Sequence, residues 1–149
     1  MGLKKILLAL LAAVLMGGVA GPTWAGPRIN IVVKTVLASQ DSTFVDPRIS
    51  ALTQKLQSVF RYSSYRLLSE DSLDLGMGET GTVSLPGKRE LKITPARIIG
   101  DRTELRLSIF KERRQIIQSV IQILNHGSII VGGPEHKGGY LLFDISSSF

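Results

Sequence analysis

From Tyr62 to the end, the chain consists of short apolar runs separated by turn residues, and this pattern limits the possible folds most. In the clearest run, Leu105, Leu107 and Ile109 alternate with Arg106 and Ser108, which is typical of a half-buried strand. The connections between the runs are too short for the crossovers that parallel strands need. The pattern therefore predicts an antiparallel sheet.

The expected strands and turns follow from this alternation. Turn residues at 76–78, 86–87, 100–101, 111–114 and 125–127 separate the apolar runs. Residues 116–124 also show a spacing that a helix would allow, but their β-branched side chains favour a strand. Residues 125–127 are expected to close a hairpin into 128–131. The strands are expected at 65–68 with a continuation to 75, 80–85, 90–93, 105–109, 116–124, 128–131 and 140–145, and Ile98-Ile99 leads into the turn at 100–101.

One strand and one helix precede this region. Residues 28–38 are rich in β-branched side chains and predict a first, largely buried strand. Asp46-Pro47 is a typical helix start, because Asp46 accepts free amide protons and Pro47 suits the first helical position. The spacing of the apolar residues that follow predicts one buried stripe on a helix ending near residue 60. The stripe comprises Ile49, Leu52, Leu56, Val59 and Phe60.

Together these elements predict an α+β domain over residues 26–149. Its one N-terminal helix is expected to pack on an antiparallel meander sheet of about six to eight strands. The alternative architecture is a small β-sandwich with the helix capping one end. The length suits one domain with one core.

Residues 1–25 have the anatomy of a secretory signal peptide. Lys4-Lys5 precedes the apolar segment 6–16, glycines follow, and Ala25 suits a cleavage site before Gly26. The alternative is a retained membrane anchor, but a spanning helix needs roughly 20 apolar residues. The chain has no cysteine, so neither lipid attachment nor disulfides are expected. We expect an exported protein of the periplasm or outer-membrane periphery of a Gram-negative bacterium.

The charge pattern argues against a nucleic-acid partner. The formal net charge of the whole chain is +6. It falls to +4 once residues 1–25, which contain Lys4 and Lys5, are removed. Both signs alternate along the mature chain, without a run of like charges typical of a polybasic arm. We therefore expect no nucleic acid partner and, at most, a peripheral association with membranes.

The most unusual segment of the mature chain is rich in glycine. Its backbone freedom would suit an anion-binding nest, but no helix follows to add its dipole. A hairpin connection that needs glycines for its turns is the favoured interpretation. The candidate binding loop comprises Gly132, Gly133, Glu135, His136, Lys137, Gly138 and Gly139.

No arrangement of residues indicates catalysis. The two histidines, His126 and His136, are too few for a zinc site, and no nucleophile with its base is recognisable. An aromatic cluster at 60–65 would suit base stacking, but more often closes a core. No catalytic residue, metal or cofactor is therefore assigned.

The function expected from these features is a non-enzymatic, envelope-associated module that binds another protein through the edge of its sheet. Two alternatives remain open. Alternation before the final Phe149 suits the last strand of a small outer-membrane β-barrel. A small secreted hydrolase using Glu135, His136 or the tyrosines is the other.

Residues 116–133 resemble the core strands of the secretin family, the outer-membrane gate proteins of bacterial secretion and pilus systems. The resemblance is carried by the β-branched run 116–124, Gly127, the apolar run 129–131 and Gly132-Gly133. The resemblance implies a related hairpin, or an accessory role in secretion or envelope assembly.

Overall fold

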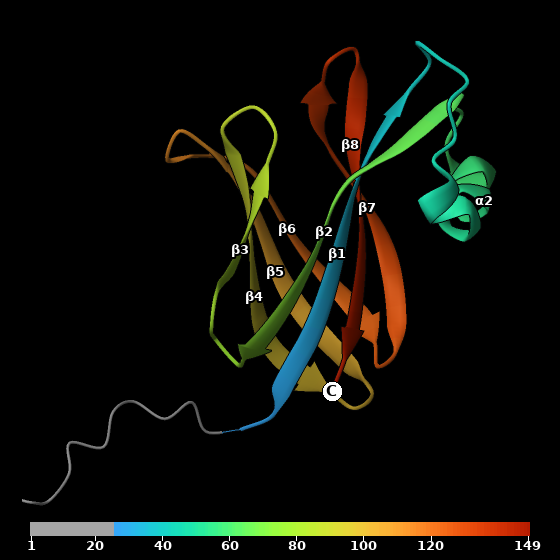
Figure 1. Cartoon of the computed structure of the whole chain (residues 1–149). Helices are drawn as coiled ribbons and strands as arrows, with labels where there is room; N and C mark the ends of the chain where they lie inside the picture. Colours follow the sequence, from blue (N-terminus) through green and yellow to red (C-terminus); the bar gives the residue numbers. More distant parts are fainter. Residues whose placement is uncertain (1–25) are drawn as a thin grey trace, which may run out of the picture.

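The computed structural model describes residues 26–149, so the predicted signal peptide lies outside the described residues. Eight strands and a short helix make up this part of the chain (Figure 1). The 3-10 helix η1 (Pro47–Ile49) leads directly into α2 (Ser50–Val59). The strands are β1 (Arg28–Ser39), β2 (Ser64–Gly76), β3 (Gly81–Leu85), β4 (Arg89–Ile99), β5 (Arg102–Lys111), β6 (Arg114–Leu124), β7 (Gly127–His136) and β8 (Gly139–Ser148).

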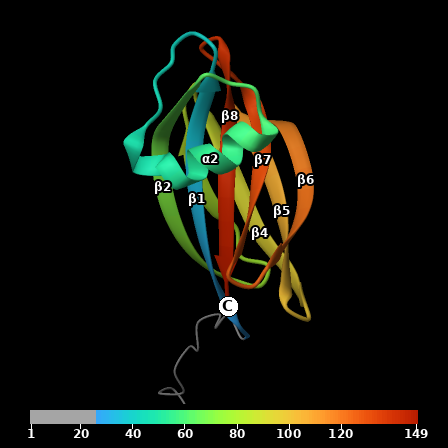
Figure 2. The same cartoon turned by 90° about the vertical axis from the view of Figure 1, so that its right-hand side faces the viewer.

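The strands form two antiparallel sheets of four. The order in sheet A is β2-β1-β8-β7, and the order in sheet B is β3-β4-β5-β6. The two sheets lie face to face, and α2 covers the outer face of sheet A (Figures 1 and 2). The chain passes from sheet A to sheet B after β2, and returns after β6.

The main core fills the space between the sheets. Because side chains alternate along a strand, every second residue of β1 points inward. Ile29, Ile31 and Val33 are fully buried in this way. Sheet B contributes the opposite half of the core with Val83, Leu85, Leu91, Ile93, Leu105, Leu107, Ile109 and Ile123.

A second apolar cluster lies between sheet A and α2. Leu56 of the helix is fully buried, as is Tyr65 at the start of β2. Val36, Ala38 and Leu142 supply the sheet side of this cluster. Sheet A is thus buried on both faces where α2 lies over it.

Two features of the expected architecture need correction. The helix is not N-terminal, because β1 precedes it. The structure has eight strands, within the expected six to eight. They form two sheets and not one meander. A ten-residue helix is too small to cover the inner face of so many strands, so the second sheet buries that face instead. The alternative architecture, a small β-sandwich, agrees with the two observed sheets. It differs in the helix, which was expected at one end of the sandwich and lies on the outer face of sheet A (Figure 2).

The start of the helix agrees with its sequence signal. Asp46 accepts a hydrogen bond from the Arg48 amide at 3.0 Å, and its other oxygen lies 2.7 Å from the Arg48 guanidinium. The amide of Leu67 also donates to Asp46, at 3.2 Å. The Arg48 hydrogen bond holds the pKa of Asp46 well below its usual range. The predicted stripe is wrong at Val59, whose side chain is 69% exposed because the helix ends there.

The expected hairpin at residues 125–127 is also wrong. In the part of the chain that the structure describes, β6 pairs only with β5, and β7 only with β8. The turn at Asn125 and His126 therefore carries the chain from one sheet to the other. The Asn125 side chain holds the C-terminus by exchanging two hydrogen bonds with the Phe149 backbone. Since β6 and β7 are not paired, residues 116–133 lack the hairpin that the secretin resemblance implies.

Within residues 26–149, no helix combines the length and apolar character needed to span a bilayer.

Candidate binding surfaces

The glycine-rich segment forms a tight hairpin between β7 and β8. Strand β7 continues to His136, and β8 begins at Gly139. Lys137 and Gly138 alone make the turn, with φ of 47° and 76°, which is typical of a two-residue type I′ turn. A bulge between Gly132 and Glu135 interrupts the pairing with β8. The segment is therefore an extended hairpin arm and not a wide loop.

Its glycines serve different purposes. Of the four, only Gly138 has a positive φ. A Cβ at Gly133 would lie 2.5 Å from the Phe143 ring, and one at Gly139 would collide with the Ala38 carbonyl oxygen. Nothing lies near the equivalent point at Gly132. Close approach to core residues thus explains two of these glycines, and turn geometry explains a third.

Arg89 connects the hairpin to the opposite sheet. Its guanidinium donates to the carbonyl oxygens of Pro86 and Glu135, both at 2.9 Å, and lies 3.3 Å from Nδ1 of His136. Only 9% of Arg89 is exposed. Burial, together with the charges of Arg89 and Lys137, lowers the pKa of His136. A neutral His136 offers Nδ1 to the guanidinium as an acceptor. The contacts of Arg89 with residues 135–136 therefore hold the hairpin against sheet B.

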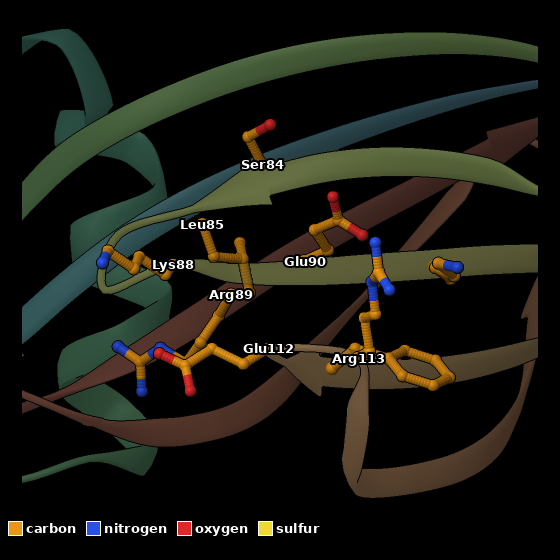
Figure 3. A pocket seen from close by; sticks show the side chains of 9 residues that line it. Ser84, Leu85, Lys88, Arg89, Glu90, Glu112 and Arg113 are labelled. Carbon is orange, nitrogen blue, oxygen red and sulfur yellow. The ribbon is translucent and has the colours of Figure 1, made fainter.

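A shallow pocket of about 530 Å³ opens beside this contact, at the ends of two hairpins of sheet B (Figure 3). Lys92 lies above the Phe110 ring, 4.8 Å from its centre. The charged lining combines four cations with two carboxylates, and Arg89 already donates to two backbone carbonyls, so the pocket does not present one kind of charge. No sequence motif marks the pocket, since its residues come from separate turns. Its charged lining comprises Lys88, Arg89, Lys92, Arg113, Glu90 and Glu112.

The aromatic cluster is part of the core under α2. Tyr65 is fully buried and donates its hydroxyl to the Phe60 carbonyl at 3.2 Å. Burial raises the pKa of Tyr65. The Tyr62 ring lies 6.4 Å from Tyr65 and 6.3 Å from Tyr140. The rings pack on one another, as expected for a junction that closes a core.

The two histidines do not meet. His126 lies in the turn before β7 and His136 at the far end of that ten-residue strand, so roughly 30 Å of extended backbone separate them. In the range 26–149, no three side chains of His, Cys, Asp or Glu are grouped as metal ligands.

The four edge strands differ in how well they are protected against pairing with another chain. In sheet A, β2 carries four charged residues, and β7 is interrupted by its bulge and by Pro134. In sheet B, β3 has only five residues. Short strands, charges, bulges and proline are the usual protection of a sheet edge. Strand β6 has a bulge at its start, where Ile116 has no partner in β5, but it has none of these features from Ile117 to Leu124.

The side chains of β6 also leave apolar surface exposed. On its outer face Ile116, Val120 and Leu124 are 42%, 57% and 47% exposed. On the inner face, Ile117 and Ile121 are only partly buried at the margin of the main core. The sequence indicated the strand, but its place at an edge was missed because no local signal tells which strands are neighbours.

Comparisons with family models, with curated proteins and with solved structures find no match for this chain.

Proposed function

We propose that the mature chain is an exported, non-enzymatic module of the Gram-negative cell envelope that binds a protein chain at the free edge of β6. The single observation that carries this proposal is the contrast between the uncharged, regular stretch 117–124 of β6 and the three protected edges. The secretory signal pattern of residues 1–25 supports the location. Envelope assembly or secretion is the setting that we propose for the interaction.

Strand addition suits the chemistry of this edge. Each residue of an edge strand directs its amide and carbonyl either to its neighbour or to the open side. An added strand pairs the groups on the open side, and alternate side chains then give specificity. Here that added strand would also cover Val120 and its exposed neighbours, as well as the half-buried Ile117 and Ile121. Burial of apolar surface and pairing of backbone groups therefore act together.

A binding role is better supported than the hydrolase considered from the sequence. His136 and the Glu135 carbonyl are engaged by Arg89. The tyrosines pack around the helix junction. Neither group forms a recognisable nucleophile and base.

Photo-crosslinking in intact cells tests the proposal. A photoreactive amino acid replaces Val120 in the full-length protein, and the matched control carries it at Thr82, an exposed position on the protected edge β3. We expect adducts with a protein chain from position 120, several-fold above those from position 82. Equal or absent adducts at the two positions would overturn the assignment to β6.

A further inference from the structure

We infer that the chain bound at β6 is a second copy of this protein, joined by antiparallel β6–β6 pairing across a two-fold axis at Val120. This inference rests on the proposed function, because it names the partner of the same edge. The two copies of sheet B would then form one continuous eight-stranded sheet.

The order of side chains on the exposed face of β6 matches itself in this register. Residues directly opposite each other in an antiparallel pair share one face of the sheet. With Val120 opposite its own copy, Ile116 lies opposite Leu124, and Gln118 lies opposite Gln122. Apolar side chains thus meet apolar ones, and amides meet amides, with the bulged Ile116 at the end of the paired stretch.

Other two-fold registers fit less well. An axis at Ser119 or Ile121 would set glutamines opposite two of the three exposed apolar side chains. An axis at Gln118 or Gln122 keeps like groups together, but pairs only two of the three exposed apolar residues. The axis at Val120 alone pairs all three.

Electrostatics also permits the pairing. Like charges directly opposite each other destabilise a strand pair. Strand β6 has no charged residue between Gln115 and Leu124, so two copies meet without such repulsion. Arg114 lies beyond the nine residues that pair in the proposed register.

The inner face gains as well. Ile117 and Ile121 lie at the open margin of the main core, where they are only partly buried. In the proposed register Ile117 lies opposite Ile123, and Ile121 lies opposite Ser119. Each copy therefore covers the margin of the other's core.

A cysteine scan of the purified mature protein tests both the partner and the register. The chain has no cysteine of its own, so single variants at 118, 119, 120 and 121 each carry one thiol. A residue on the two-fold axis lies opposite its own copy at about 4.5–5.5 Å between Cβ atoms, within reach of a short bismaleimide. We expect Val120→Cys to give several-fold more crosslinked dimer than the other three. Thr82→Cys on β3 is the background control.

A charge at the axis gives an independent measurement. Val120→Lys would place two ammonium groups opposite each other, and its exposure lets the monomer keep its fold. In sedimentation velocity we expect a dimer for the wild type, and a dissociation constant at least about tenfold higher for Val120→Lys. Thr82→Lys should leave the dimer unchanged. Tyrosine fluorescence confirms that each variant is folded.

The outcomes separate this inference from the proposed function. A wild type that sediments as a monomer up to high concentration, with no excess crosslinking at position 120, would overturn self-pairing. If photo-crosslinking from position 120 then traps a different protein, the binding role of β6 stands and only the identity of the partner fails. Absence of both signals would refute both claims.

Discussion

Truncation of Leu56 tests the contact between the helix and sheet A. Leu56 is fully buried among Val36, Ala38, Tyr65 and Leu142. Leu56→Ala removes its branched end from this cluster and leaves a space that the rigid sheet beneath cannot fill. We expect the variant to be strongly destabilised.

The magnitude follows from the atoms removed. The change deletes the equivalent of three methylene groups, each contributing about 0.8 kcal/mol when buried. The transfer contribution is therefore about 2.4 kcal/mol, and the cavity brings the total loss to about 3–4 kcal/mol. With a urea dependence of about 1.5–2 kcal/mol per molar, the unfolding midpoint should fall by about 2 M.

Tyrosine fluorescence suits this measurement. The chain has three tyrosines, all in the cluster beside α2, and its single tryptophan, Trp24, belongs to the predicted leader. In the mature protein, tyrosine emission therefore reports on this cluster. Urea titrations followed by emission, and in parallel by circular dichroism of the strands, show whether the helix and the sandwich unfold together.

Val59→Ala is the matched control, because Val59 belongs to the same apolar stripe in the sequence but is 69% exposed. Its loss should cost under about 0.5 kcal/mol. Equal midpoint shifts for the two variants, or a shift below about 0.5 M for Leu56→Ala, would refute the assignment of Leu56 to the interface.

Three further predictions concern the hairpin and the leader. Because the folded protein lowers the pKa of His136, the unfolded chain binds more protons, so the free energy of unfolding should fall as pH drops below about 6.5. His136→Asn should weaken this dependence in urea titrations from pH 8 to 5, and an unchanged slope would contradict the contact with Arg89. Gly133→Ala should lower the free energy of unfolding by about 1–3 kcal/mol through overpacking against Phe143. Gly132→Ala should change it by under about 0.5 kcal/mol, and similar losses for both would refute the close approach. The intact mass of protein from an envelope fraction should match a chain that begins within a few residues of Gly26, whereas a mass that includes residues 1–25 would show a retained anchor.

Local signals predicted most of the secondary structure. Alternation marked the strands of sheet B, and Asp46-Pro47 marked the helix start, because both signals depend on residues close together in the chain. Val59 was assigned to the buried stripe because spacing alone does not tell where the last turn ends. Its neighbour Phe60 is already extended.

The glycine-rich segment shows what local signals do not predict. The composition indicated conformational freedom. Gly133 and Gly139 are instead required because a side chain there would collide with Phe143 and Ala38, which belong to other strands. Likewise, nothing near Arg89 in the sequence predicts its contact with His136 in the other sheet. Contacts of this kind depend on how the sheets are placed, which local patterns do not encode.

The edge position of β6 also could not be predicted, because it depends on how the two sheets are placed. Residues 116–124 were expected to pair on both sides, with a hairpin into the next strand. The turn at Asn125 instead moves the chain to sheet A, so β6 loses that neighbour and becomes an edge. A sequence suited to a central strand, uncharged and β-branched, is thereby left with one side open. The other three edges are short, charged or interrupted, whereas β6 is uncharged and regular from Ile117 to Leu124, and this contrast is the basis of the proposed binding role.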